Sequence, residues 1–147
     1  MQNYFPSISA VCDCASISAE ELDQHDTVEI PTAVLKELIK AALGTVKVDS
    51  ALYAELNPDL VQAGIRSSEE LAQHYRLTGY FEQRTPPFRF DHKYYLLKNE
   101  DVKTAVLAGQ VQDAFQHYLH QGIREGRPPN SDAELEAGRW ARLLRRR

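Results

Sequence analysis

The sequence FDHKYYLLKNEDVKTAVLAGQVQDAFQHYLHQGIREGRPP, residues 90–129, decides the fold, because residues 48–87 repeat its pattern. At an offset of 42 residues the matched pairs are Asp49/Asp91, Tyr53/Tyr95, Asn57/Asn99, Asp59/Asp101 and Ala63/Ala105. The second copy then gains one residue, and at an offset of 43 the pairs are Gln73/Gln116, His74/His117, Tyr75/Tyr118, Gly79/Gly122, Glu82/Glu125, Arg84/Arg127 and Pro86/Pro129. A period of this size predicts stacked helical units. Each unit is too small to bury its own apolar face alone.

Helix start and stop signals predict three short helices in each copy. Asn57, Pro58 and Asp59 are typical of a helix start: a cap for the free amides, a proline at the first position and an acid at the positive end of the dipole. Asn99 takes the capping place in the second copy. A short helix is predicted before each cap, a second over 58–63 and 100–108, and a third over 68–78 and 112–121. The predicted stops are Gly64 and Gly109 for the second helices and Gly79 and Gly122 for the third.

The predicted fold class is all-α, with two tandem helical repeat units between an N-terminal and a C-terminal capping helix. Residues 1–29 are predicted to be a partly loose N-terminal segment with one short helix, opened by a capping box from Ser18 to Glu21. Residues 30–147 are predicted to form a single helical domain. Its parts are an amphipathic helix at 30–44, the repeats at 48–87 and 90–129, and a basic helix at 131–147 that a second capping box, Ser131 to Glu134, opens.

Length and composition are those of an ordinary globular domain. A chain of 147 residues with 43% hydrophobic and 26% charged residues can bury one core. No apolar run reaches membrane-spanning length, and the N-terminus lacks a basic region followed by an apolar stretch, so we expect a cytoplasmic protein without a membrane span. A net charge of −4 disfavours nucleic acid as a partner of the whole chain.

Charge and apolar residues are distributed unevenly at the two ends. Residues 1–47 carry a net charge of −4 and residues 131–147 carry +2. In the C-terminal stretch an apolar stripe of Ala133, Ala137, Trp140 and Leu144 runs beside a row of arginines. The candidate partner-binding residues are Arg139, Trp140, Arg142 and Arg146. This helix is interpreted either as a cap with its arginines at the negative end of the dipole or as a docking site. We expect Trp140 to pack on the second repeat, near Tyr118 or Leu119.

The paired positions are interpreted as structural. His74 and His117 have the residue type for acid–base chemistry, but an active site is seldom duplicated together with its surroundings, so we expect each histidine to form a hydrogen bond within or between units. The aspartates and arginines are predicted to form a lattice of caps and ion pairs. The tyrosines are predicted to lie in the core, with a sugar-stacking surface as the alternative. The repeat-structural residues are Asp49, Asn57, Asp59, His74, Tyr75, Gly79, Arg84, Asp91, Asn99, Asp101, His117, Tyr118, Gly122 and Arg127.

No catalytic, cofactor or metal site is predicted. Cys12 and Cys14 are the only cysteines, and a metal site would need further ligands near them. Two reduced thiols are the interpretation that fits a cytoplasmic protein. Neither a nucleophile with its base nor a phosphate-binding loop is visible in the sequence, so we predict that the chain is not an enzyme.

The second copy resembles a bacterial tandem helical repeat that is found beside glycosyltransferase domains and in proteins of surface-polysaccharide production. The resemblance rests on Phe90-Asp91, Tyr94-Tyr95-Leu96, Asn99-x-Asp101-Val102, His117-Tyr118 and Gly122-x-x-Glu125-Gly126-Arg127-x-Pro129, and it extends from residue 30 to residue 127. It implies a non-catalytic segment and brings no catalytic residues with it. The chain has neither a glycosyltransferase domain nor a nucleotide-sugar motif, so the link to polysaccharides is one of association.

We therefore predict a non-catalytic bacterial interaction or scaffold protein, accessory to polysaccharide biosynthesis or cell-envelope assembly. Its expected partner is a protein, and a homo-oligomer is compatible with the repeat ends. Two other hypotheses stay open. One is a carbohydrate-binding module that stacks glycans on the repeated tyrosines. The other is a regulator that binds nucleic acid or an anionic surface through the arginine-rich tail.

Overall fold

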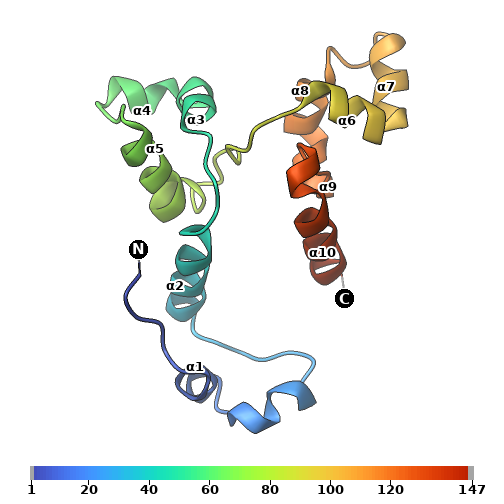
Figure 1. Cartoon of the computed structure of the whole chain (residues 1–147). Helices are drawn as coiled ribbons and strands as arrows, with labels where there is room; N and C mark the ends of the chain where they lie inside the picture. The colour runs from blue at the N-terminus through green and yellow to red at the C-terminus, as the bar shows by residue number, and fades with distance from the viewer. Residues whose placement is uncertain (1, 146–147) are drawn as a thin grey trace.

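The structure is a computed structural model that describes residues 2–145, and it confirms the all-α fold class. Helices account for 62% of these residues, and no strand occurs among them. Figure 1 shows two helical lobes, α3–α5 and α6–α9, joined by an extended linker. Helix α2 extends from the first lobe and α10 from the second, so that the molecule has two separate limbs.

The N-terminal part is more regular than the sequence predicts. Its elements are α1 (Ile8–Cys14), the 3₁₀ helix η1 (Ala19–Gln24) and α2 (Thr32–Leu43). The sequence predicted one short helix in this segment, and the structure has a further one, α1, where the Ser7 hydroxyl accepts a hydrogen bond from the Ala10 amide at 3.2 Å and Cys12 is buried. A helix of seven residues makes fewer than two turns, which is too short for an apolar period to show in the sequence.

Helix α2 contacts the first lobe at its C-terminal end. The ammonium groups of Lys36 and Lys40 lie over the Phe81 ring, 5.8 and 6.0 Å from its centroid. The Arg76 guanidinium of η2 donates a hydrogen bond at 2.7 Å to the carbonyl of Val46, which lies just beyond the end of α2. These contacts fix the segment that leads from α2 into the first repeat.

The two lobes have separate buried clusters. The first contains α3 (Ser50–Leu56), α4 (Pro58–Gln62), α5 (Ser68–His74) and the π-helical turn η2 (Tyr75–Gly79). The second contains α6 (His92–Lys98), α7 (Glu100–Leu107), α8 (Ala114–His117), the π-helical turn η3 (Tyr118–Gly122) and α9 (Ile123–Glu125). The buried clusters are Tyr53, Leu60, Leu71 and Tyr75 in the first lobe and Tyr95, Val102, Ala114 and Tyr118 in the second. Helices this short depend on such packing for their stability.

The glycines of the repeat play two different roles. Gly64 and Gly109 follow α4 and α7 with φ values of 95° and 73°, as expected for helix stops. Gly79 and Gly122 were predicted to be stops as well. The third helix of the first lobe does end at Gly79, the last residue of η2, but in the second lobe α9 continues beyond Gly122, so the prediction is wrong there. Neither glycine has a positive φ value. A Cβ at either position would collide with a tyrosine hydroxyl, so glycine is needed there for close approach.

The C-terminal helix is α10 (Glu134–Leu144), preceded by the 3₁₀ turn η4 (Ser131–Ala133). The predicted capping box at its start is wrong. Asn130 caps instead, by accepting a hydrogen bond from the Ala133 amide at 3.1 Å, and its side-chain amide donates to the Arg89 carbonyl at 2.6 Å. The Glu134 carboxylate is drawn away to α6, where it accepts hydrogen bonds from the Tyr94 hydroxyl and from the Lys98 ammonium group.

Candidate functional site

A buried tyrosine meets a histidine at the same place in both lobes. The Tyr53 hydroxyl lies 3.0 Å from Nδ1 of His74, and the Tyr95 hydroxyl lies 2.9 Å from Nδ1 of His117. Both phenol rings are fully buried. Burial raises the pKa of Tyr95 to about 12, so the phenol keeps its proton at neutral pH. The histidines thus satisfy a buried hydroxyl, and neither meets a serine, threonine or cysteine nucleophile in these contacts.

In each lobe an arginine donates two hydrogen bonds to the carboxylate of one aspartate. Arg84 donates to both carboxylate oxygens of Asp59, at 3.1 and 3.0 Å. Arg127 donates to both oxygens of Asp101, at 2.9 and 2.8 Å. In each lobe the guanidinium lowers the pKa of the aspartate below its usual range. These forks tie the start of the second helix to the segment that follows the third.

The asparagines at the second-helix starts do not cap with their side chains, contrary to the prediction. Asn57 donates from its side-chain amide to the Tyr53 carbonyl at 2.8 Å and accepts from Arg84 at 2.9 Å. Asn99 makes the same pair of hydrogen bonds, with Tyr95 and Arg127. The arginine therefore occupies the oxygen that would otherwise bind the free amides of α4 and α7.

The aspartates that open each lobe do cap their helices. Asp49 accepts from the Leu52 amide at 3.0 Å and Asp91 accepts from the Tyr94 amide at 3.0 Å. Their own amides donate to the carbonyls of Pro87 and Pro129, at 2.8 and 3.0 Å. The end of each repeat is thereby fastened to its beginning, in the same way in both lobes.

The core position of the tyrosines removes the sugar-stacking hypothesis for these residues. Tyr53, Tyr75, Tyr95 and Tyr118 have exposed fractions between 0 and 3%. A carbohydrate ring needs an accessible aromatic face to stack on, and none of the four offers one.

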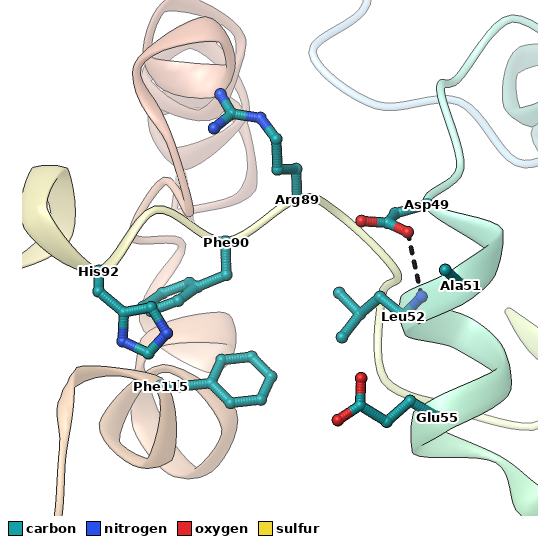
Figure 2. A pocket seen from close by; sticks show the side chains of 8 residues that line it. All are labelled: Asp49, Ala51, Leu52, Glu55, Arg89, Phe90, His92 and Phe115. Atoms are coloured by element: carbon teal, nitrogen blue, oxygen red, sulfur yellow. Dashed lines mark hydrogen bonds between the residues drawn. The ribbon is translucent and has the colours of Figure 1, made fainter.

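A small hollow of about 390 Å³ lies between α3 and the start of the second lobe. Figure 2 shows Asp49, Leu52 and Glu55 on one side and the Phe90 and Phe115 rings on the other. The Asp49 carboxylate is already engaged with the Leu52 amide, as the dashed line in Figure 2 marks. The hollow is a seam between the lobes, and its aromatic wall belongs to the core of the second one.

A larger groove of about 1070 Å³ runs between α10 and the segments that enter and leave the first lobe. One wall is the predicted apolar stripe, Ala133, Ala137, Trp140 and Leu144, and the other includes Val46, Val48, Pro86 and Phe88. Tyr118 and Ile123 also line the groove. The groove is therefore lined by three parts of the chain that are far apart in sequence.

Trp140 does not pack as predicted. Its side chain is 58% exposed, although Tyr118 lines the same groove. The segments around Val46 and Phe88 form the opposite wall of the groove instead of covering the indole. The stripe on α10 thus has the helical spacing expected of a core face, but the groove in front of it is open.

The arginines predicted beside this stripe are exposed as far as the structure describes them. Arg139 and Arg142 lie outside the groove lining, and Arg146 lies outside the described residues. Arg145 does line the groove and donates a hydrogen bond to the Glu125 carbonyl. The apolar spacing in the sequence predicted the α10 wall of the groove. No sequence pattern predicted the opposite wall, because its residues come from two loop segments.

The described part of the chain holds neither a cluster of metal ligands nor a membrane-spanning helix. No group of three or more histidine, cysteine, aspartate or glutamate side chains suitable for a metal ion occurs within residues 2–145. Cys12 and Cys14 are unpaired thiols, and the Cys14 thiol contacts the Val11 carbonyl at 2.9 Å. Among these residues no helix has both the length and the apolar character needed to cross a bilayer.

Comparisons with known proteins leave the family open. No protein-family model, no curated protein and no solved structure matches the chain.

Proposed function

We propose that the chain is a non-catalytic interaction protein that binds a partner protein in the groove beside α10. The observation that carries this proposal is Trp140, the single tryptophan of the chain, which is 58% exposed and lines a groove of about 1070 Å³. Tryptophan is among the residues that most often dominate binding energy at protein interfaces. An exposed indole inside an apolar groove is therefore a natural anchor for a partner.

The walls of the groove support a protein partner. Leu144 at the end of the stripe is 75% exposed, and Trp140, Val46 and Phe88 are further apolar residues of the lining. Apolar surface of this kind, bordered by charged residues, is typical of interaction sites. Lys47 and Arg124 are charged residues of the same lining.

In this proposal, hydrogen bonds in both lobes hold the walls of the groove in place before a partner binds. The bond from the Asp49 amide to the Pro87 carbonyl fixes one wall, and the bonds of Asn130 and Glu134 fix the start of α10. A surface held in place before binding loses less conformational entropy when a partner arrives. The same duplicated hydrogen bonds support the interpretation of 48–87 and 90–129 as two repeat units, with the histidines in a structural role.

The proposed setting follows from the resemblance of the repeat. It is that of a bacterial accessory protein in polysaccharide or cell-envelope assembly, acting in the cytoplasm. The groove supplies the contact surface that such a scaffold needs, and the partner is a protein of that assembly.

Site-specific photo-crosslinking tests the proposal. A photoreactive phenylalanine analogue replaces Trp140 in cells that express the chain naturally, and the control carries the analogue at Leu107, which is 80% exposed and lies outside the groove. The proposal expects discrete crosslinked products from position 140 and none from position 107. No product from position 140, or the same products from both positions, contradicts it.

A further inference from the structure

The head segment, residues 2–29, presents a second apolar surface. Tyr4, Phe5 and Ile8 are 81, 56 and 57% exposed, and they lie at the start of α1. The head segment contains six acidic residues and neither lysine nor arginine. The acidic residues are Asp13, Glu20, Glu21, Asp23, Asp26 and Glu29. It thus combines exposed apolar side chains with a strong negative charge.

The groove beside α10 combines apolar side chains with basic residues that could face these acids. Two of its arginines are already held by carboxylates, Arg89 by Asp91 and Asp132 and Arg127 by Asp101 and Glu125. Lys47, Arg124 and Arg145 also line it, and none of the three forms an ion pair within 4.0 Å to another described residue. The opposing acids are Glu136 and Asp49, and the Asp49 carboxylate already caps α3.

The dimensions of the two surfaces agree as well. Helix α1 has seven residues and α10 has eleven, so their lengths are about 10 and 16 Å at 1.5 Å per residue. The shorter helix and the residues before it can lie along the α10 wall. Figure 1 shows α1 and α10 at the ends of different limbs, so the head segment does not cover the groove of its own chain.

We propose, building on the function proposed above, that the groove binds the head segment of a second copy of this chain. Phe5 and Ile8 enter the apolar groove against Trp140, and the acidic residues of the head segment face Lys47, Arg124 and Arg145. Opposite charges favour this orientation over head-to-head or groove-to-groove contact. When two copies exchange head segments reciprocally, the contact closes into a two-fold dimer.

Analytical ultracentrifugation of three purified variants and the wild-type chain tests this proposal. The groove variant is Trp140→Glu, the head variant combines Phe5→Glu with Ile8→Glu, and the control is Leu107→Glu on a surface outside both. All four replaced side chains are exposed, so folding should persist, and far-ultraviolet circular dichroism verifies it. The wild-type chain and the control are expected to associate as concentration rises, and more weakly at high salt. Each of the other variants alone should associate roughly 30-fold more weakly, the effect of losing one hot spot.

Mixing the two defective variants gives the decisive result. The groove variant keeps an intact head segment and the head variant keeps an intact groove, so an equimolar mixture should form a one-to-one dimer, through one intact contact, more tightly than either variant associates alone. Failure of the mixture to associate, or wild-type association of either variant alone, overturns the proposal. A wild-type chain that stays a single-chain species also overturns it, and a crosslink from position 140 to a different protein in cells then leaves the proposed function standing.

Discussion

Replacing Gly122 with alanine should destabilise the second lobe severely, because the glycine makes room for the Tyr95 hydroxyl. A Cβ at this position would overlap that hydroxyl and would lie 3.3 Å from Cζ of the same ring and 3.2 Å from Cδ2 of Tyr118. Both rings belong to the buried core of the lobe and have little freedom to withdraw.

The expected cost follows from three contributions. Overpacking a well-packed core costs about 1–3 kcal/mol. If Tyr95 moves, its hydrogen bond to His117 breaks, which adds about 1–3 kcal/mol for a buried polar group without a partner. The better helix propensity of alanine returns about 0.5–1 kcal/mol. We therefore expect Gly122→Ala to lower the free energy of unfolding by about 1–5 kcal/mol, a large share of the about 5–15 kcal/mol typical of a domain.

Urea denaturation followed by far-ultraviolet circular dichroism measures this cost, and two further variants control it. Gly138→Ala places a methyl group on α10 where no atom lies within 4 Å, so it should be neutral or stabilise the chain by up to about 1 kcal/mol. Tyr95→Phe removes the colliding hydroxyl, so the double variant Gly122→Ala/Tyr95→Phe should be more stable than Gly122→Ala alone. If Gly122→Ala unfolds at the same urea concentration as Gly138→Ala, the close-approach role of this glycine is refuted.

Three other outcomes are expected. His117→Ala should lower the free energy of unfolding by about 1–3 kcal/mol because it leaves a buried phenol without its partner, whereas His120→Ala at an exposed position should change it little; equal urea midpoints would reopen a catalytic role. The pKa of Asp101 is lowered in the folded chain by Arg127, so its stabilising contribution is complete above its ordinary pKa of 3.8 and is lost as the pH falls through the folded value. Asp101→Asn should therefore flatten the acid limb of the stability–pH curve, and an unchanged limb would contradict this. Deleting 131–147 should lower the melting temperature, because it removes the contacts of η4 and α10 with the start of the second lobe; an unchanged melting curve would show that α10 is not part of the fold.

The all-α fold class was predictable from sequence, because capping residues, helix stops and core positions recur at offsets of 42 and 43 residues. Short-range signals carried the elements: Asp49 and Asp91 cap as expected, and Gly64 and Gly109 take positive φ values. The sequence misled where a side chain had a competing partner. Arg84 takes the oxygen with which Asn57 would have capped its helix, and Tyr94 and Lys98 draw Glu134 away from a capping box.

The candidate site was predictable on one side only. The spacing of Trp140 and Leu144 marked an apolar face on α10, and this face is one wall of the groove. Whether a neighbouring element covers such a face depends on the path of the linkers near Val46 and Phe88, and no local sequence signal sets that path. Gly79 and Gly122 show the same limit, because their need for glycine comes from a tyrosine of a different helix.

The fluorescence of Trp140 in the dilute, purified chain tests the central claim most directly. Trp140 is the single tryptophan, so emission and acrylamide quenching report on the groove alone. An open groove predicts the red-shifted emission of a hydrated indole and efficient quenching at the lowest measurable concentration, with a blue shift when a partner occupies the groove. Blue-shifted emission that resists acrylamide at every dilution would show that the chain covers Trp140 itself, and it would contradict the assignment of the groove as the interaction site.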